Sequence, residues 1–117
     1  MAVDAYIGEP FVFNEYYVDN TGAPVVMLNL NITLFRFDAL GDTVTLINAA
    51  VMSPADPPDP GRYVYAYMVP PSLVDGTTLY SEIRATDPIT GFVSVSNETL
   101  NLRSRPTDLG LRSRFVK

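Results

Sequence analysis

The feature that most constrains the fold of this chain is a series of short runs in which apolar and polar side chains alternate. Alternation at period two is the pattern of half-buried β-strands, and no stretch shows a sustained apolar period of 3.6 residues. Several of these runs are bounded by Gly, Pro, Asn or Asp, which are turn residues. The pattern predicts an all-β fold, an antiparallel β-sandwich of about seven strands. The clearest strand-like runs cover 10–18, 25–37, 43–47 (continuing, bent, towards Met52), 61–69, 79–86 and 92–102.

Two runs indicate which side chains should face the core. The first run places Leu28, Leu30, Ile32 and Leu34 on one face. The second places Leu79, Ser81, Ile83 and Ala85 on one face and the even-numbered residues between them on the other. In the last run the apolar positions change from odd to even near Asn97, which predicts a β-bulge there, because one extra residue reverses the inward face.

The segments between the runs indicate how the strands connect. Asp19-Asn20-Thr21-Gly22 predicts the turn of a hairpin, and residues 87–91 predict another turn. Four prolines within residues 53–60 predict a stiff connecting loop. Residues 70–76 are expected to carry the chain from one sheet to the other.

Charge divides the chain into two parts. Residues 1–102 carry three basic and twelve acidic groups, whereas residues 103–117 carry five basic groups and one acidic group. A chain of 117 residues has room for one domain. We therefore expect a sandwich over 1–102 and an extended basic C-terminal arm over 103–117.

Several motifs in the second half of the chain resemble immunoglobulin-like and prealbumin-like β-sandwich modules. They are Gly61-x-Tyr63-x-Tyr65-x-Tyr67, Leu73-x-Asp75-Gly76, Leu79-Tyr80 and Arg84-Ala85-Thr86-Asp87-Pro88-x-Thr90-Gly91. The resemblance covers roughly residues 6–102 and implies an immunoglobulin-like sandwich, of a kind that recurs in virion proteins of tailed phages. Asp75-Gly76 ahead of Tyr80 resembles the tyrosine corner of that fold.

The residue types that are missing restrict the chemistry. The chain has no His and no Cys, which excludes zinc and copper sites of the usual kind and Ser-His-Asp or Cys-His catalysis. Asp56 and Asp59 are close in sequence, but we expect their proline-rich loop to stay too exposed to shift a carboxyl pKa. The sequence therefore predicts no enzyme, no cofactor and no metal site.

Three tyrosines at period two, Tyr63, Tyr65 and Tyr67, allow two interpretations. Aromatic residues on one face of a central strand usually pack in the core, and we favour this interpretation. The alternative is a stacking platform for a sugar or a partner protein.

The arm is the strongest candidate for a binding element. Leu102-Arg103-Ser104-Arg105 recurs nine residues later as Leu111-Arg112-Ser113-Arg114. The alternative is a frayed, solvated chain end. Such a tail has little use for apolar side chains between its arginines, whereas an arm lying on a neighbour would bury them and pair its guanidinium groups with carboxylates. The predicted partner-binding residues are Arg103, Arg105, Leu109, Leu111, Arg112, Arg114 and Phe115.

These features lead to a functional expectation. We predict a non-enzymatic structural virion protein of a tailed phage, in particular a capsid decoration (cement) protein that docks by its arm on other virion proteins such as the major capsid protein. It is expected to form a homo-oligomer and to be made in the host cytoplasm, since no signal peptide or membrane span is visible. Alternatives are a neck, tail or baseplate component, or a carbohydrate or cell-surface binding module. Nucleic acid is not an expected partner, because the body is strongly acidic.

Overall fold

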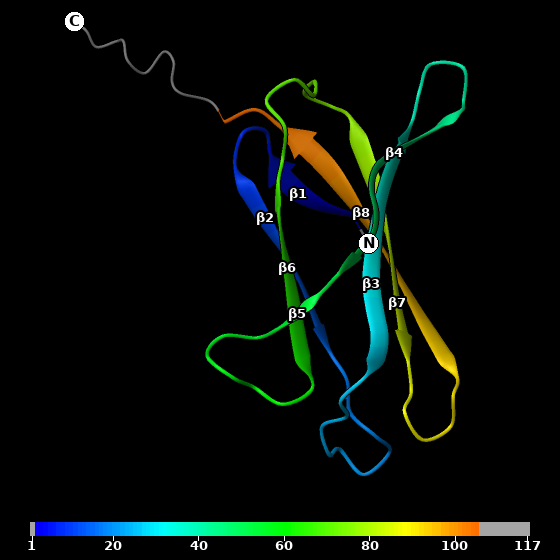
Figure 1. Ribbon diagram of the computed structural model, residues 1–117. Helices are drawn as coiled ribbons and strands as arrows, with labels where there is room; N and C mark the ends of the chain where they lie inside the picture. Colours follow the sequence, from blue (N-terminus) through cyan, green and yellow to red (C-terminus); the bar gives the residue numbers. More distant parts are fainter. Residues whose placement is uncertain (1, 106–117) are drawn as a thin grey trace, which may run out of the picture.

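Two β-sheets face each other in the computed structural model, which describes residues 2–105 (Figure 1). The larger sheet has five strands in the order β1 (Ala2–Tyr6), β8 (Val93–Arg103), β7 (Thr78–Thr86), β3 (Leu28–Phe37) and β4 (Thr43–Val51). The smaller sheet has three, in the order β2 (Pro10–Tyr16), β6 (Arg62–Met68) and β5 (Ser53–Pro54). The predicted all-β sandwich is confirmed. Within the described range no helix is long and apolar enough to cross a membrane.

The strand order resembles that of an immunoglobulin-like sandwich, except that the first strand joins the other sheet. If the strands are lettered A, B, C, C′, D, E, F and G along the chain, the sheets become A-G-F-C-C′ and B-E-D. Strand β1, which the sequence did not predict, lies parallel to β8, with Ala2 opposite Thr99 and Tyr6 opposite Arg103. The other pairings are antiparallel.

The core lies between the two sheets and contains most of the predicted inward positions. Leu79, Ser81, Ile83 and Ala85 are all buried, as are Leu30, Ile32 and Leu34. Leu28 was expected on the same face but is 49% exposed. The register of β3 against β7 shifts between Leu28 and Asn31, and Asn29 there has a φ of 50°. This bulge turns Leu28 away from the core.

The bulge predicted near Asn97 is wrong. The β7–β8 register runs without a break from Thr78 opposite Asn101 to Thr86 opposite Val93. Leu100 and Leu102 are buried, whereas Val93 and Val95 point outward and are 54% and 45% exposed. The inward face of β7 fixes the register of β8, so the two valines remain on the outer face.

The hairpin predicted at residues 19–22 is also wrong as a strand pairing. The turn forms, but it closes only a single antiparallel bridge between Val18 and Pro24. Strands β2 and β3 then belong to different sheets. In contrast, residues 87–91 do join β7 to β8 as a hairpin, and residues 69–77 cross from one sheet to the other as expected.

Tyr80 does not form the predicted tyrosine corner. It pairs opposite Phe35 on β3 and lies between the buried residues Leu79 and Ser81 in the chain, which places its ring on the outer face of the larger sheet. The ring stacks on Phe35, with centroids 5.6 Å apart. A tyrosine corner needs the hydroxyl to turn back to the backbone at the edge of the sandwich.

The sandwich has two distinct ends (Figure 1). The loop end is formed by residues 17–27, 55–61 and 87–92. The arm end is formed by the loops 7–9, 38–42 and 69–77, and Ser104 and Arg105 leave β8 there. Strand β8 connects the two ends, because it follows the 87–92 loop and ends at Arg103.

Candidate functional site

The described start of the arm is fixed to the sandwich by Arg105. Its guanidinium donates two hydrogen bonds to the carboxylate of Glu9, from Nε at 2.8 Å and from Nη2 at 3.1 Å. The same guanidinium lies 3.7 Å from the centre of the Tyr6 ring, which is a cation–π contact. The hydrogen bond from Arg105 holds the pKa of Glu9 below its ordinary value. The carboxylate of Glu9 in turn raises the pKa of Arg105.

The two preceding residues add weaker contacts. Arg103 Nε lies 3.5 Å from Asp4 Oδ1, and Ser104 N donates to Asp75 Oδ2 at 3.0 Å. The carbonyl of Arg103 accepts a hydrogen bond from Ile7 N. The first unit of the arginine repeat is therefore bound to its own sandwich.

This arrangement separates the predicted partner-binding residues into two groups. Arg103 and Arg105 contact carboxylates of the same chain. The other predicted residues lie outside the described range; they are Leu109, Leu111, Arg112, Arg114 and Phe115.

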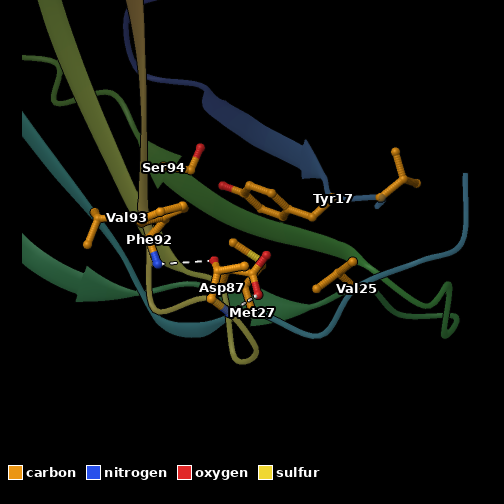
Figure 2. Close-up of a pocket in the computed structure, with 9 residues that line it drawn as sticks. Tyr17, Val25, Met27, Asp87, Phe92, Val93 and Ser94 are labelled. Carbon is orange, nitrogen blue, oxygen red and sulfur yellow. Dashed lines mark hydrogen bonds between the residues drawn. The ribbon is translucent and has the colours of Figure 1, made fainter. Parts of the chain in front are cut away.

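At the loop end, two loops line an open pocket of about 340 Å³ (Figure 2). One wall comes from Tyr17, Val18, Val25 and Met27, and the other from Asp87, Thr90 and the start of β8. A second hollow that also includes Asp19, Asn20 and Ile89 shares several of these residues. We call the two hollows together the loop groove. Sequence reasoning missed it, because its walls are about seventy residues apart in the chain.

The loop groove is apolar at its rim. Ile89 is 90% exposed, Phe92 77% and Val18 46%. Large apolar side chains rarely gather in solvent on a monomeric protein unless they meet a partner. The groove therefore has the character of a contact surface.

Two aspartates give the loop groove its charge. Asp19 Oδ1 accepts hydrogen bonds from Thr21 Oγ1, Thr21 N and Ala23 N, at 2.6, 2.8 and 3.0 Å. These bonds, led by the one from the Thr21 side chain, hold the pKa of Asp19 below its ordinary value. Asp87 Oδ1 accepts from Ile89 N and Thr90 N. These bonds all end on Oδ1, so each Oδ2 can face a cation.

The floor of the loop end is rigid. A Cβ on Gly61, whose φ is +82°, would lie 2.6 Å from the carbonyl oxygen of Tyr17, and Tyr17 N donates to Gly61 O. Only glycine permits this approach and this φ. Burial and the nearby Glu15 carboxylate raise the pKa of Tyr17 to about 12, so its hydroxyl stays neutral in the wall of the groove.

A second apolar surface lies on the outside of the smaller sheet. The β2–β6 face consists of Pro10, Val12, Val64, Ala66 and Met68. Val12 is 53% exposed and Met68 is 56% exposed. At one end of the face Arg62 is bound to Asp59 at 2.7 Å and Asn14 at 2.9 Å. In an antiparallel sheet with one solvated face, the outward residues are normally polar, whereas the five outward residues named here are apolar.

The tyrosines of β6 belong mainly to the core. Tyr63 and Tyr67 are 8% and 6% exposed, and Tyr65 is partly buried. Tyr63 Oη accepts a hydrogen bond from Met27 N at 3.2 Å, which links it to the loop end. The core-packing interpretation is therefore confirmed.

A different aromatic group is accessible on the outer face of the larger sheet. Phe35, Phe37 and Tyr80 form a cluster with ring centroids 5.3 to 5.7 Å apart, and Phe37 is 49% exposed. Sequence reasoning did not identify it, since the rings come from β3 and β7, whose pairing no local pattern gives.

Between residues 2 and 105, no group of three or more acidic residues could hold a metal ion. Comparison with known proteins gives no relative, since no protein family and no curated protein matches the sequence.

Proposed function

We propose that this chain is a non-enzymatic structural subunit of a larger assembly, and in its most specific form a capsid decoration (cement) protein of a tailed phage that docks with the help of its C-terminal arm. The observation that carries the proposal is the β2–β6 face, which is apolar and largely exposed. Apolar surface exposed to water raises the free energy of the protein, and covering it with a partner surface removes this cost.

Size shows that the face does not act alone. Two strands of seven residues cover an area of about 23 by 10 Å. A stable interface buries about 800 Å² on each partner, so further contacts must complete it. In this proposal the arm adds to the attachment by joining each subunit to its neighbours, since it carries apolar residues and arginines beyond the anchored Arg105.

Charge favours the same face. The sandwich is strongly acidic overall, and a second protein approaching it meets repulsion unless that protein is basic or the contact is neutral. The five residues of the β2–β6 face carry no charge, whereas Asp56 and Asp59 lie in the adjoining loop, where Asp59 is paired with Arg62. A neck, tail or baseplate position would use the same surfaces, so these positions remain alternatives within the proposal.

The test uses shells of the major capsid protein encoded beside this chain. We expect saturable binding of the full-length protein, weakened at least about tenfold by Val12→Lys with Ala66→Lys, since both lysines must be desolvated in the contact. The matched control adds two lysines to the other sheet, Thr45→Lys with Asn97→Lys, and should bind within about twofold of the original.

Absence of a capsid gene beside this one, or shells that bind no full-length protein, would contradict the decoration form. If both double variants bind equally well, the β2–β6 face is not the contact.

A carbohydrate-binding module is the second candidate. The predicted tyrosine platform is buried, but the Phe35, Phe37 and Tyr80 cluster offers another aromatic surface. Saturable glycan binding that Phe37→Ala abolishes, with the unfolding midpoint unchanged, would favour this candidate over the first.

A further inference from the structure

The described half of the arginine repeat shows how such a unit binds to this protein. Leu102 is fully buried, Arg103 lies beside Asp4, and Arg105 forms a double hydrogen bond with Glu9. The unit thus uses one apolar anchor and two arginines that each meet a carboxylate. Leu102 ends the buried side of strand β8, and the carboxylates of Asp4 and Glu9 lie beside the two arginines where the strand leaves the core.

The second unit has the same residue types. Leu111-Arg112-Ser113-Arg114 repeats the first unit and is followed by Phe115, a larger apolar anchor. By the chemistry of the first unit, the second requires an apolar hollow flanked by two carboxylates.

The loop groove has this composition. Its open pocket of about 340 Å³ is large enough for a phenyl ring, and Val18, Val25 and Phe92 line it. Asp19 and Asp87 lie in its walls, and among the wall residues that the structure describes there is no lysine or arginine. Each aspartate directs only Oδ1 to its own loop, which leaves Oδ2 for a guanidinium.

Distance excludes an easy return of the arm to its own groove. Strand β8 has eleven residues and separates the two ends by about 33 Å. Phe115 lies ten residues beyond Arg105 and can reach at most about 35 Å from it in a fully extended chain. Turning back would use several of these residues, whereas a neighbouring molecule can bring its groove to the arm.

We infer that residues 111–115 of one copy bind in the loop groove of a second copy. Phe115 and Leu111 fill the apolar pocket, and Arg112 and Arg114 pair with Asp87 and Asp19. This inference rests on the proposed function, since it names the partner of the arm in the assembly. The contact is head-to-tail, because arm and groove lie at opposite ends of the sandwich, and it generates a ring or an open row of subunits.

The test mixes two full-length variants that are each defective on one side only. The arm variant carries Arg112→Ser, Arg114→Ser and Phe115→Ser, with an intact groove. The groove variant carries Asp19→Asn, Asp87→Asn and Phe92→Ser, with an intact arm. Asn keeps the Oδ1 acceptor that each turn needs, and Phe92 is largely exposed, so the groove variant should retain its fold.

Masses are measured by light scattering over a hundredfold range of protein concentration. We expect the original chain to exceed the monomer mass and each variant alone to stay monomeric. The equimolar mixture should reach twice the monomer mass and no more, because only one intact arm and one intact groove can meet.

Three results would overturn the inference. The original chain could stay monomeric throughout, which would mean that the groove holds its own arm or a different protein. The arm variant could associate as the original does, or the mixture could remain monomeric.

A control makes the same kinds of change at the other end of the sandwich. Asp38 Oδ1 accepts from Leu40 N and Asp42 N, and Leu40 is 87% exposed, so this loop matches the 87–92 loop in chemistry. Asp38→Asn with Leu40→Ser should associate as the original does, and loss of association here would overturn the choice of groove. Shell binding through the β2–β6 face is measured separately, so failure of either proposal leaves the other decidable.

Discussion

The two ends of the sandwich treat charge and apolar surface in opposite ways. At the arm end, carboxylates of Asp4 and Glu9 meet arginines of the same chain, and the apolar residue of the repeat, Leu102, is buried. At the loop end, the hydrogen bonds to Asp19 and Asp87 within residues 2–105 come from their own loops, and Ile89 and Phe92 are exposed. The comparison teaches that similar residue types can complete a fold at one end and remain exposed at the other.

The largest expected difference concerns one apolar residue at each end. Leu102→Ala should cost about 3 kcal/mol of unfolding free energy, because it leaves a cavity in the core. Phe92→Ala removes a larger side chain that is 77% exposed and should cost less than about 0.5 kcal/mol. Urea unfolding of the two variants measures both values. Equal costs would break the comparison, since Phe92 would then be part of the fold.

A pair of glycines gives the next largest difference. Gly61→Ala at the loop end should cost about 3 kcal/mol, because the new Cβ meets the Tyr17 carbonyl and the φ of +82° is strained. Gly76→Ala at the arm end also has a positive φ, but nothing lies within 4 Å of its Cβ, so a cost of about 1 kcal/mol is expected. The denaturation midpoint measures both costs. Similar losses of stability would show that the backbone around Gly61 and Tyr17 can move to admit a Cβ.

The smallest expected effects are on two carboxyl pKa values, which NMR titration measures. Arg105→Met should return the pKa of Glu9 towards 4.5 and leave that of Asp19 unchanged. Thr21→Val should raise the pKa of Asp19 towards 3.8 and leave that of Glu9 unchanged. In the original chain both pKa values are lowered by folding. Each group therefore stabilises the fold above its unfolded pKa, and this contribution is lost as the pH falls through the lowered value. A change that crossed from one end to the other would contradict their independence.

The sequence predicted the sandwich and most of its strands, because alternation and turn residues are local signals. It located β7 and the inward residues Leu79 to Ala85, the proline-rich loop and the loop that crosses between sheets. It missed β1, a five-residue strand whose partner β8 lies almost at the other end of the chain. It also placed a bulge at Asn97. The register shifts instead involve β3 and its neighbours, where Asn29 and Ala49 have positive φ angles although they are not glycines.

The candidate site was less predictable than the fold. The repeat in the arm was visible, and so were the aspartates at residues 19 and 87 as turn residues. That these two loops share a groove depends on β2 and β3 lying in different sheets, which no local pattern encodes. The apolar character of the β2–β6 face was also hard to predict. Both sides of β6 carry large apolar or aromatic side chains, so its sequence does not show which side faces the core.

The parallel pairing of β1 with β8 has a mechanical consequence. If a neighbour held the arm under tension, the load would enter β8 at Arg103 and run along the strand. Five β1 pairings on one side and nine β7 pairings on the other lie across that line of force. They would be loaded in shear, all together, rather than peeled apart one by one. Strand β8, from which the arm leaves the sandwich, is therefore also the strand best held against a pull on the arm.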